Sequence, residues 1–199
     1  DGLIRASAGA LLVKIASLAL RESLTGMEFA SGIPGTLGGA LTMNAGAYGG
    51  EMKDIVSSVR LFDLRQKTIR ELSREQMQFG YRHSIVSDGG FVILGATLLL
   101  QKGEQDKIWE RMEELKEQRT RKQPLEYPSC GSAFKRPAGY YAAALIEECG
   151  LKGKAVGGAE VSSKHAGFII NRDHATPDDI LELFSLVKNT VEEKKGVTL

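Results

Sequence analysis

The residues best suited to chemistry lie in the stretch SCGSAFKRPAG, where Ser132 follows Gly131. The cations Lys135 and Arg136 come shortly after this serine. Glycine lets a backbone approach a ligand closely, a hydroxyl can donate a proton, and lysine and arginine bind anionic oxygens. The pattern therefore predicts a glycine-flanked turn that binds an anionic small molecule, followed by a helix at 140–149.

A second candidate is the segment FGYRHS, in which Arg82 stands between Tyr81 and His83. A guanidinium carries a permanent charge and could stabilise an anion, but an arginine in a surface turn is usually solvated, so the residues alone leave both interpretations open. The three histidines have no metal-ligand spacing relative to the two cysteines, and no metal site is predicted.

Residues 26–51 are dense in glycine, which favours loops that pass close to a bulky ligand. Their spacing matches neither GxGxxG nor GxxxxGK[ST], which argues against those two phosphate-binding motifs. A short helix is expected at 36–43, with its amides directed at the same place. The alternative is that the glycines serve the packing of this helix against a sheet.

Composition narrows the class of partner. The chain has 199 residues, with 26 Lys and Arg against 25 Asp and Glu. This balance gives no bulk field for nucleic acid or membrane, so we expect neither partner and favour a small molecule. The two cysteines are too few for a disulfide framework, which suits a reducing cytoplasm. The length allows one large domain or two small ones.

Periodicity predicts an α+β chain that these loops interrupt. A helix with Ser7 as its cap is expected within 1–20, and a highly charged helix at 105–122 leads into a second unit. Thr176 followed by Pro177 predicts the start of a last helix, ending near 195. Strands are expected at 55–63, 67–72, 91–100 and 168–171, and a pair of strands at 154–161.

Four blocks together resemble the UDP-N-acetylenolpyruvoylglucosamine reductase family, and they occur in the family's order: SGIPGTLGGALTMNAGAYGGE, GYRHS, PSCGSAFKRP with GYYAAALIEECGLKG, and GGAEVSSKHAGFIIN. The resemblance implies an α+β fold made of a second FAD-binding domain of the vanillyl-alcohol-oxidase type and a smaller substrate-binding domain. Residues 1–117, including the connector helix, correspond to the first of these. Residues 118–199 correspond to the second.

The same resemblance implies roles for particular residues. Ser132 matches the family's proton-donating serine, and Arg82 its active-site arginine. Substrate contacts would come from Lys135, Arg136 and Tyr81. The residues implied to contact the cofactor are Gly32, Ile33, Pro34, Gly35, Gly38, Gly39, Asn44, Ala45, Gly46, Ala47, Tyr48 and Gly49.

The implied activity is the reduction of UDP-N-acetylglucosamine enolpyruvate to UDP-N-acetylmuramate by NADPH through FAD, in cytoplasmic peptidoglycan precursor synthesis. The chain resembles the shorter family form, without a tyrosine-bearing insertion. The family's first FAD-binding domain and its C-terminal glutamate strand have no match, so a fragment with little activity of its own is expected. Two alternatives stay open: another flavoprotein of this fold, and a noncatalytic nucleotide-sugar-binding module. No oligomeric state is predicted.

Overall fold

The computed structural model describes residues 2–199. The chain divides into two compact units, Asp1–Glu117 and Gln118–Leu199. Each unit contains both strands and helices around its own hydrophobic core, which confirms the predicted α+β class.

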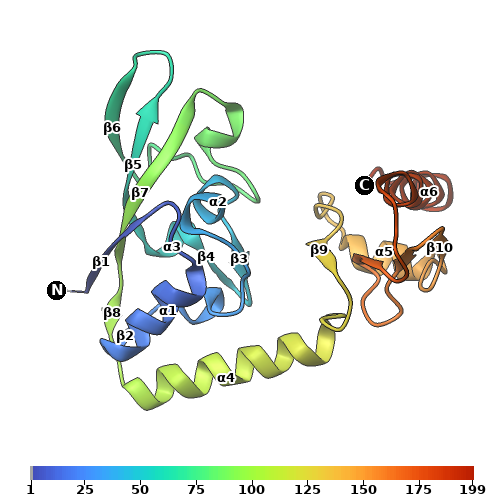
Figure 1. Ribbon diagram of the computed structural model, residues 1–199, viewed down its shortest axis with the longest axis horizontal. Helices are drawn as coiled ribbons and strands as arrows, with labels where there is room; N and C mark the ends of the chain where they lie inside the picture. Colours follow the sequence, from blue (N-terminus) through green and yellow to red (C-terminus); the bar gives the residue numbers. More distant parts are fainter. Residues whose placement is uncertain (1) are drawn as a thin grey trace. The chain divides into compact units, whose positions relative to one another are not determined.

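The first unit is built on a four-stranded antiparallel sheet in the order β1-β7-β5-β6 (Figure 1). The alternating pattern predicted three of these strands, and the register of β5 against β7 runs from Val56↔Leu98 to Asp63↔Phe91. The strands are β1 (Leu3–Ser7), β5 (Val56–Asp63), β6 (Thr68–Ser73) and β7 (Phe91–Leu99).

The beginning of the chain differs from the prediction. Leu3–Ser7 form the strand β1, and the helix α1 (Leu12–Arg21) begins with Leu11 at its cap, so Ser7 does not cap it. β1 pairs antiparallel with β7, Leu3 opposite Leu99. The edge of a distant strand supplies these hydrogen bonds, and a helical pattern read along the sequence cannot show it.

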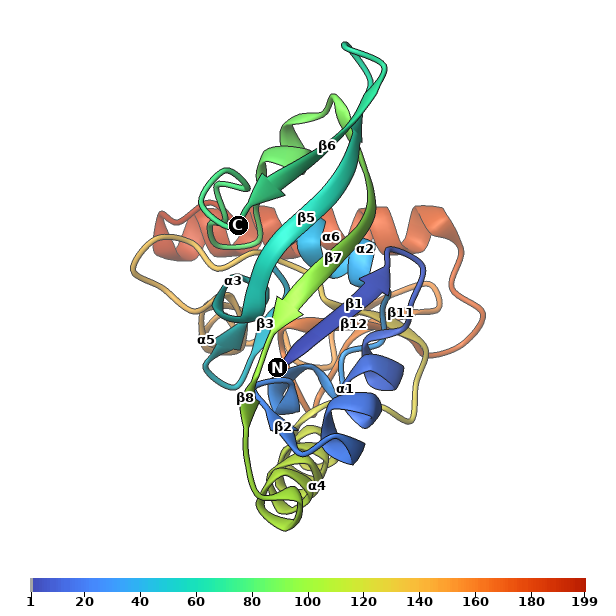
Figure 2. The same ribbon diagram turned by 90° about the vertical axis from the view of Figure 1, so that its left-hand side faces the viewer.

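Helices cover one face of the sheet, with α1, α2 (Leu37–Thr42) and α3 (Met52–Ile55) on the same side (Figures 1 and 2). The predicted short helix is confirmed as α2, whose Gly39 N–H donates to Thr36 Oγ1. Apolar side chains from the sheet and helices form one buried core, which includes Ile4, Leu12, Ile15, Leu37, Leu41, Met52, Val59, Leu61 and Leu98.

Short elements connect these parts. The strands β2 (Leu24–Thr25) and β8 (Gln101–Lys102) pair with each other, as do β3 (Gly46–Ala47) and β4 (Gly50–Glu51). Two 3-10 turns, η1 (Glu28–Ala30) and η2 (Ile85–Asp88), follow the glycine at 26 and the FGYRHS segment. The predicted charged helix is α4 (Gln105–Lys122), with a buried stripe of Ile108, Met112 and Leu115.

The second unit has a sheet in the order β10-β11-β12-β9. Its helices α5 (Ala142–Glu148) and α6 (Pro177–Lys195) pack with it around a core that includes Leu145, Val161, Ile169, Leu183 and Val187. The strands are β9 (Ser129–Ser132), β10 (Ala155–Val156), β11 (Ala159–Val161) and β12 (Phe168–Asn171).

The start of α6 agrees with the sequence pattern. Asp179 N–H donates to Thr176 Oγ1, the Asp179 carboxylate accepts from Thr176 N–H, and Pro177 occupies the first turn. Of the helices formed by residues 2–199, none combines the length and apolar character needed to cross a bilayer.

Candidate active site

Arg82 lies at the tip of a tight turn in the first unit. Gly80 N–H donates to the His83 carbonyl at 3.0 Å, which closes the turn, and Arg82 itself has a φ of 52°. Its Nη2 donates to the Gly46 carbonyl at 2.9 Å, and its guanidinium carbon lies 5.1 Å from the centre of the Tyr81 ring. The charge is therefore oriented by a backbone oxygen and an aromatic face.

Ser84 ties the same turn to the end of α2. It is fully buried, and its Oγ donates to the Thr42 carbonyl at 2.9 Å. Ser87 Oγ donates to the same carbonyl, while it also accepts from Ser84 N–H in a capping box on η2. Sequence reasoning assigned no role to Ser84, although a serine directly before an apolar pair is a capping signal that could have indicated one.

The loop that receives Arg82 is compact enough to require glycine. A Cβ at Gly46 would stand 2.6 Å from the Gly50 carbonyl oxygen, and one at Gly50 would stand 2.6 Å from the Phe29 ring. Tyr48 and Gly49 at the tip have φ values of 53° and 88°, and both are exposed. The β3-β4 turn thus brings a narrow backbone ribbon beside Arg82 while it presents Tyr48 outward.

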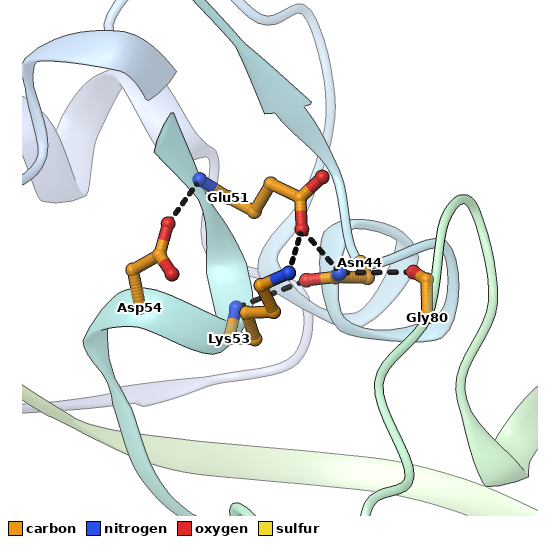
Figure 3. Close-up of polar contacts among 5 residues, drawn as sticks. All are labelled: Asn44, Glu51, Lys53, Asp54 and Gly80. Atoms are coloured by element: carbon orange, nitrogen blue, oxygen red, sulfur yellow. Dashed lines mark hydrogen bonds and ion pairs between the residues drawn. The ribbon is translucent and has the colours of Figure 1, made fainter. Parts of the chain in front are cut away.

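Asn44, predicted as a cofactor contact, is buried in the structure. Its relative exposure is 0%, and its side-chain amide is engaged inside the unit by Glu51, Lys53 and Gly80 (Figure 3). Because the side chain has no accessible surface, its observed contacts are those that shape the loop, and its contact with a cofactor stays a prediction. The sequence pattern did not separate it from its exposed neighbours.

Glu51 supplies a negative charge to this cluster. Its carboxylate accepts from Asn44 at 3.0 Å and pairs with Lys53 Nζ at 2.8 Å. The hydrogen bond from Lys53 lowers the pKa of Glu51 most, and the Asn44 amide and the charges of Lys53 and Arg82 add to it, against a smaller opposing effect of burial. Glu51 is therefore an ionised carboxylate at neutral pH.

The turn before α2 presents unused backbone donors. Within residues 2–199, the N–H groups of Gly32, Gly35 and Thr36 donate no described hydrogen bond. A Cβ placed on Gly35 would meet nothing within 4 Å, so space is open beside it. Gly38 is different, because a Cβ there would stand 3.1 Å from Ala8 Cβ, and its glycine serves packing between α2 and the chain entering α1.

Ser132 lies in the second unit, at the end of β9. The prediction of a loop here was wrong, because β12 offers an edge to which Ser129 and Ser132 pair opposite Ile170 and Phe168. Four small or polar residues carry no alternating pattern, so this strand depends on its partner. Ser132 is exposed and follows Gly131, whose φ is 84° and whose Cα faces open space.

The cations after Ser132 are also at the surface. Lys135 and Arg136 are exposed, and the Arg136 guanidinium carbon stacks 4.2 Å from the centre of the Tyr141 ring. This contact holds the charge of Arg136 at the start of α5.

His165 lies beside the β9-β12 edge. Its Nδ1 accepts from Gly167 N–H at 3.1 Å, and Gly167 in turn accepts from Ala133 N–H at 2.7 Å through its carbonyl. Burial lowers the pKa of His165, which favours the neutral ring with its proton on Nε2. The half-buried ring packs edge-on against Phe168, so His165 supports the strand that pairs with Ser132.

The structure thus gathers the predicted residues into two sets. Arg82, with Tyr81 stacked beside its guanidinium, meets the loop from Asn44 to Gly49 through the Gly46 carbonyl in the first unit. Ser132, Lys135 and Arg136 follow one another around the β9 edge in the second unit. A charged guanidinium and an exposed hydroxyl are suited to stabilising an anion and donating a proton, respectively.

Comparisons with known sequence families match each unit separately. A family described as FAD binding domain matches residues 1–73. A family described as UDP-N-acetylenolpyruvoylglucosamine reductase, C-terminal domain, matches residues 123–199. The two matches lie in the order of the two units.

Individual proteins are similar over the whole chain. The UDP-N-acetylenolpyruvoylglucosamine reductase of Clostridium novyi is 54% identical over 194 residues, which cover 98% of this chain and 63% of that protein. The reductase of the same name from Clostridioides difficile is 54% identical over 199 residues, 100% of this chain and 65% of that protein. The chain therefore spans just under two thirds of the length of these relatives.

A solved structure is similar in fold. The crystal structure of UDP-N-acetylenolpyruvylglucosamine reductase from Thermus caldophilus superposes with a TM-score of 0.87 and is 37% identical. The match covers 100% of this chain and 71% of that one.

Proposed function

Because this chain belongs to the UDP-N-acetylenolpyruvoylglucosamine reductase family, we propose that it forms part of an FAD-dependent enzyme of peptidoglycan precursor synthesis. The reaction would reduce UDP-N-acetylglucosamine enolpyruvate to UDP-N-acetylmuramate with NADPH. One observation carries the proposal: identity of 54% extends over all 199 residues and so includes both the FAD-binding match and the reductase-specific domain. We place the reaction in the cytoplasm, in keeping with the free thiols of Cys130 and Cys149.

The first unit fits an FAD pyrophosphate. The N–H groups of Gly32, Gly35 and Thr36 lack partners within residues 2–199, and the space beside Gly35 is open. Unpaired amides in a glycine-rich turn are suited to phosphate oxygens. We propose that this turn and the β3-β4 loop hold the cofactor, with the remaining contacts from Ile33, Pro34, Gly38, Gly39, Ala45, Gly46, Ala47, Tyr48 and Gly49.

When bound, FAD would take hydride from NADPH and deliver it to the enolpyruvyl double bond. Arg82 would bind the substrate carboxylate and stabilise the negative charge that develops there, because a guanidinium keeps its proton and presents several donors in one plane. Its hydrogen bond to Gly46 and its stacking on Tyr81 limit its freedom before substrate arrives, which lowers the cost of this interaction.

Ser132 would donate the proton that completes the reduction at the adjacent carbon. Its hydroxyl is exposed at a strand end, within reach of a ligand. A serine hydroxyl is a weak acid, so this transfer requires a strongly basic carbon as acceptor and a site from which the bound substrate excludes water. Tyr81, Lys135 and Arg136 would bind the other polar groups of the substrate, the two cations at its phosphates.

The serine on the same strand offers a matched test. Ser129 and Ser132 are both exposed on β9, and Ser129 Oγ accepts a long hydrogen bond of 3.4 Å from Gly131 N–H. In the full-length enzyme, Ser132→Ala should slow reoxidation of the reduced flavin by the enolpyruvyl substrate by about 10²- to 10⁴-fold, as expected for loss of a general acid. Ser129→Ala should change it by less than about threefold.

Stopped-flow absorbance of the flavin separates the two half-reactions. Reduction by NADPH should be equal in wild type and both variants. Equal reoxidation rates in Ser132→Ala and Ser129→Ala would remove the role proposed for Ser132. A full-length protein that bound no FAD and oxidised no NADPH with the enolpyruvyl substrate would overturn the proposed function itself.

A further inference from the structure

The geometry points to Asn44 as a positioning residue that holds the Arg82 turn against the glycine loop. This inference rests on the proposed role of Arg82 and adds the means by which the guanidinium is kept in place.

Asn44 forms the centre of a buried polar cluster (Figure 3). Its Nδ2 donates to the Gly80 carbonyl at 2.9 Å and to Glu51 Oε2 at 3.0 Å. Its Oδ1 accepts from Lys53 N–H at 2.9 Å. The residue is 0% exposed, so no water can replace a lost partner without disturbing the packing.

Two hydrogen bonds with the same sequence offset connect the loop to the turn. Asn44 binds the carbonyl of Gly80, which begins the turn, and Gly46 binds the guanidinium of Arg82, which forms its tip. Both bonds join residues 36 positions apart. A rotation of the turn that kept one bond would strain the other, so the pair fixes the direction of the Arg82 side chain.

The direction of the Asn44 amide is itself determined. Lys53 N–H faces Oδ1, and the ionised Glu51 carboxylate faces Nδ2, so a flipped amide would set two donors together and two acceptors together. Glu51 is anchored in turn, because its N–H donates to Asp54 Oδ2 in the capping box of α3 (Figure 3). The positive φ of Asn44, 41°, is a conformation that asparagine tolerates well.

The cluster allows the Gly80 tie to be removed while residue 44 keeps its contacts with Lys53 N–H and with residue 51. In the double variant Asn44→Asp with Glu51→Gln, the new carboxylate can still accept from Lys53 N–H and from the Gln amide. The Gly80 carbonyl then faces an acceptor and loses its donor. Glu51→Gln alone controls for the lost charge of Glu51, because Asn44 keeps all three of its hydrogen bonds. The double variant also turns the Gln amide toward Lys53 Nζ, but the Lys53 side chain is about half exposed and can turn to solvent. Val59→Ala, in the buried part of β5, controls for general loss of stability in the same unit.

Hydrogen exchange of the 199-residue chain tests the contact without any ligand. The double variant should exchange the amides of 79–84 about tenfold faster or more, while Glu51→Gln and Val59→Ala leave this segment within about twofold of one another after correction for global stability. Unchanged protection of 79–84 in the double variant would overturn the inference, whatever the enzyme does.

Kinetics of the full-length enzyme test the consequence for Arg82. The double variant should slow flavin reoxidation by the enolpyruvyl substrate by about 10- to 100-fold relative to Glu51→Gln alone, with both rates measured on the flavin-bound enzyme so that a change in FAD content does not enter the comparison. In an Arg82→Lys background, the same double variant should cost less than about twofold more, because a positioning residue has no effect once its target is lost. If the double variant slowed flavin reoxidation by the same factor in the Arg82→Lys background as in the wild type, the inference would be overturned. A wild-type enzyme without this activity would instead refute the proposed function and leave the exchange result to stand.

Discussion

Gly46→Ala tests whether the β3-β4 loop is as tight as its contacts indicate. The new Cβ would stand 2.6 Å from the Gly50 carbonyl oxygen, 2.7 Å from Glu51 Cγ and 3.3 Å from Glu51 Cα. Two of these are backbone atoms of the paired strand, so a side-chain rotation cannot relieve the clash. The β3-β4 pairing has to open, and with it the acceptor of Arg82 moves.

The expected cost follows from the size of the overlap. An ordinary contact begins near 3.4 Å, so the strands must separate by most of an ångström at this point. Overpacking of this kind costs about 1–3 kcal/mol. For a unit of this size, that corresponds to a fall in Tm of roughly 4–15 °C.

Gly35→Ala is the matched control. It makes the same chemical change in the other predicted cofactor loop, but its Cβ meets nothing within 4 Å. Scanning calorimetry of the 199-residue chain should show the first unit melting earlier in Gly46→Ala and within about 2 °C of wild type in Gly35→Ala. Equal Tm values for the two variants would refute the steric reasoning. If FAD approaches the turn as proposed, Gly35→Ala should still weaken FAD binding in the full-length enzyme, which titration by absorbance would measure.

Two further predictions concern the second unit. Thr176→Ala should cost about 1 kcal/mol of stability, because it removes the cap of α6. The control Thr190→Ala, within the helix, should cost less than about 0.5 kcal/mol. Urea unfolding measures both variants, and equal midpoints would mean that the cap contributes nothing. Burial lowers the pKa of His165, so the unfolded chain binds more protons as pH falls below its ordinary value of 6.5. Stability should therefore be full above pH 6.5 and decline below it, levelling off beneath the folded pKa, and melts of His165→Gln should lose this decline between pH 7 and 5. An identical slope in the variant would exclude His165 as its source.

Several elements could be predicted because their signals are local. The charged helix α4 and the capped helix α6 were found from their periodicity, their end residues and the Thr-Pro pair. The apolar run of β7 and the hairpin of β5 and β6 were found in the same way. Each of these signals lies within the element that it describes.

Two strands that depend on pairing with a distant strand, β1 and β9, were not predicted from the sequence. β1 exists because β7 offers it an edge, and β9 because β12 does. Neither strand has an alternating pattern strong enough to be recognised alone, and the bonds that stabilise them come from residues far along the chain.

For the candidate site too, some features follow from local sequence and others from the tertiary structure. By itself, the sequence determined the family and the residue types capable of chemistry, since the motifs around Arg82 and Ser132 are contiguous and carry their own glycines and cations. The tertiary structure decided which of those residues are accessible. Asn44 is buried beneath the turn that it holds through the Gly80 carbonyl, whereas the space beside Gly35 is open. Long-range hydrogen bonds and packing determine this accessibility, and the order of residues does not.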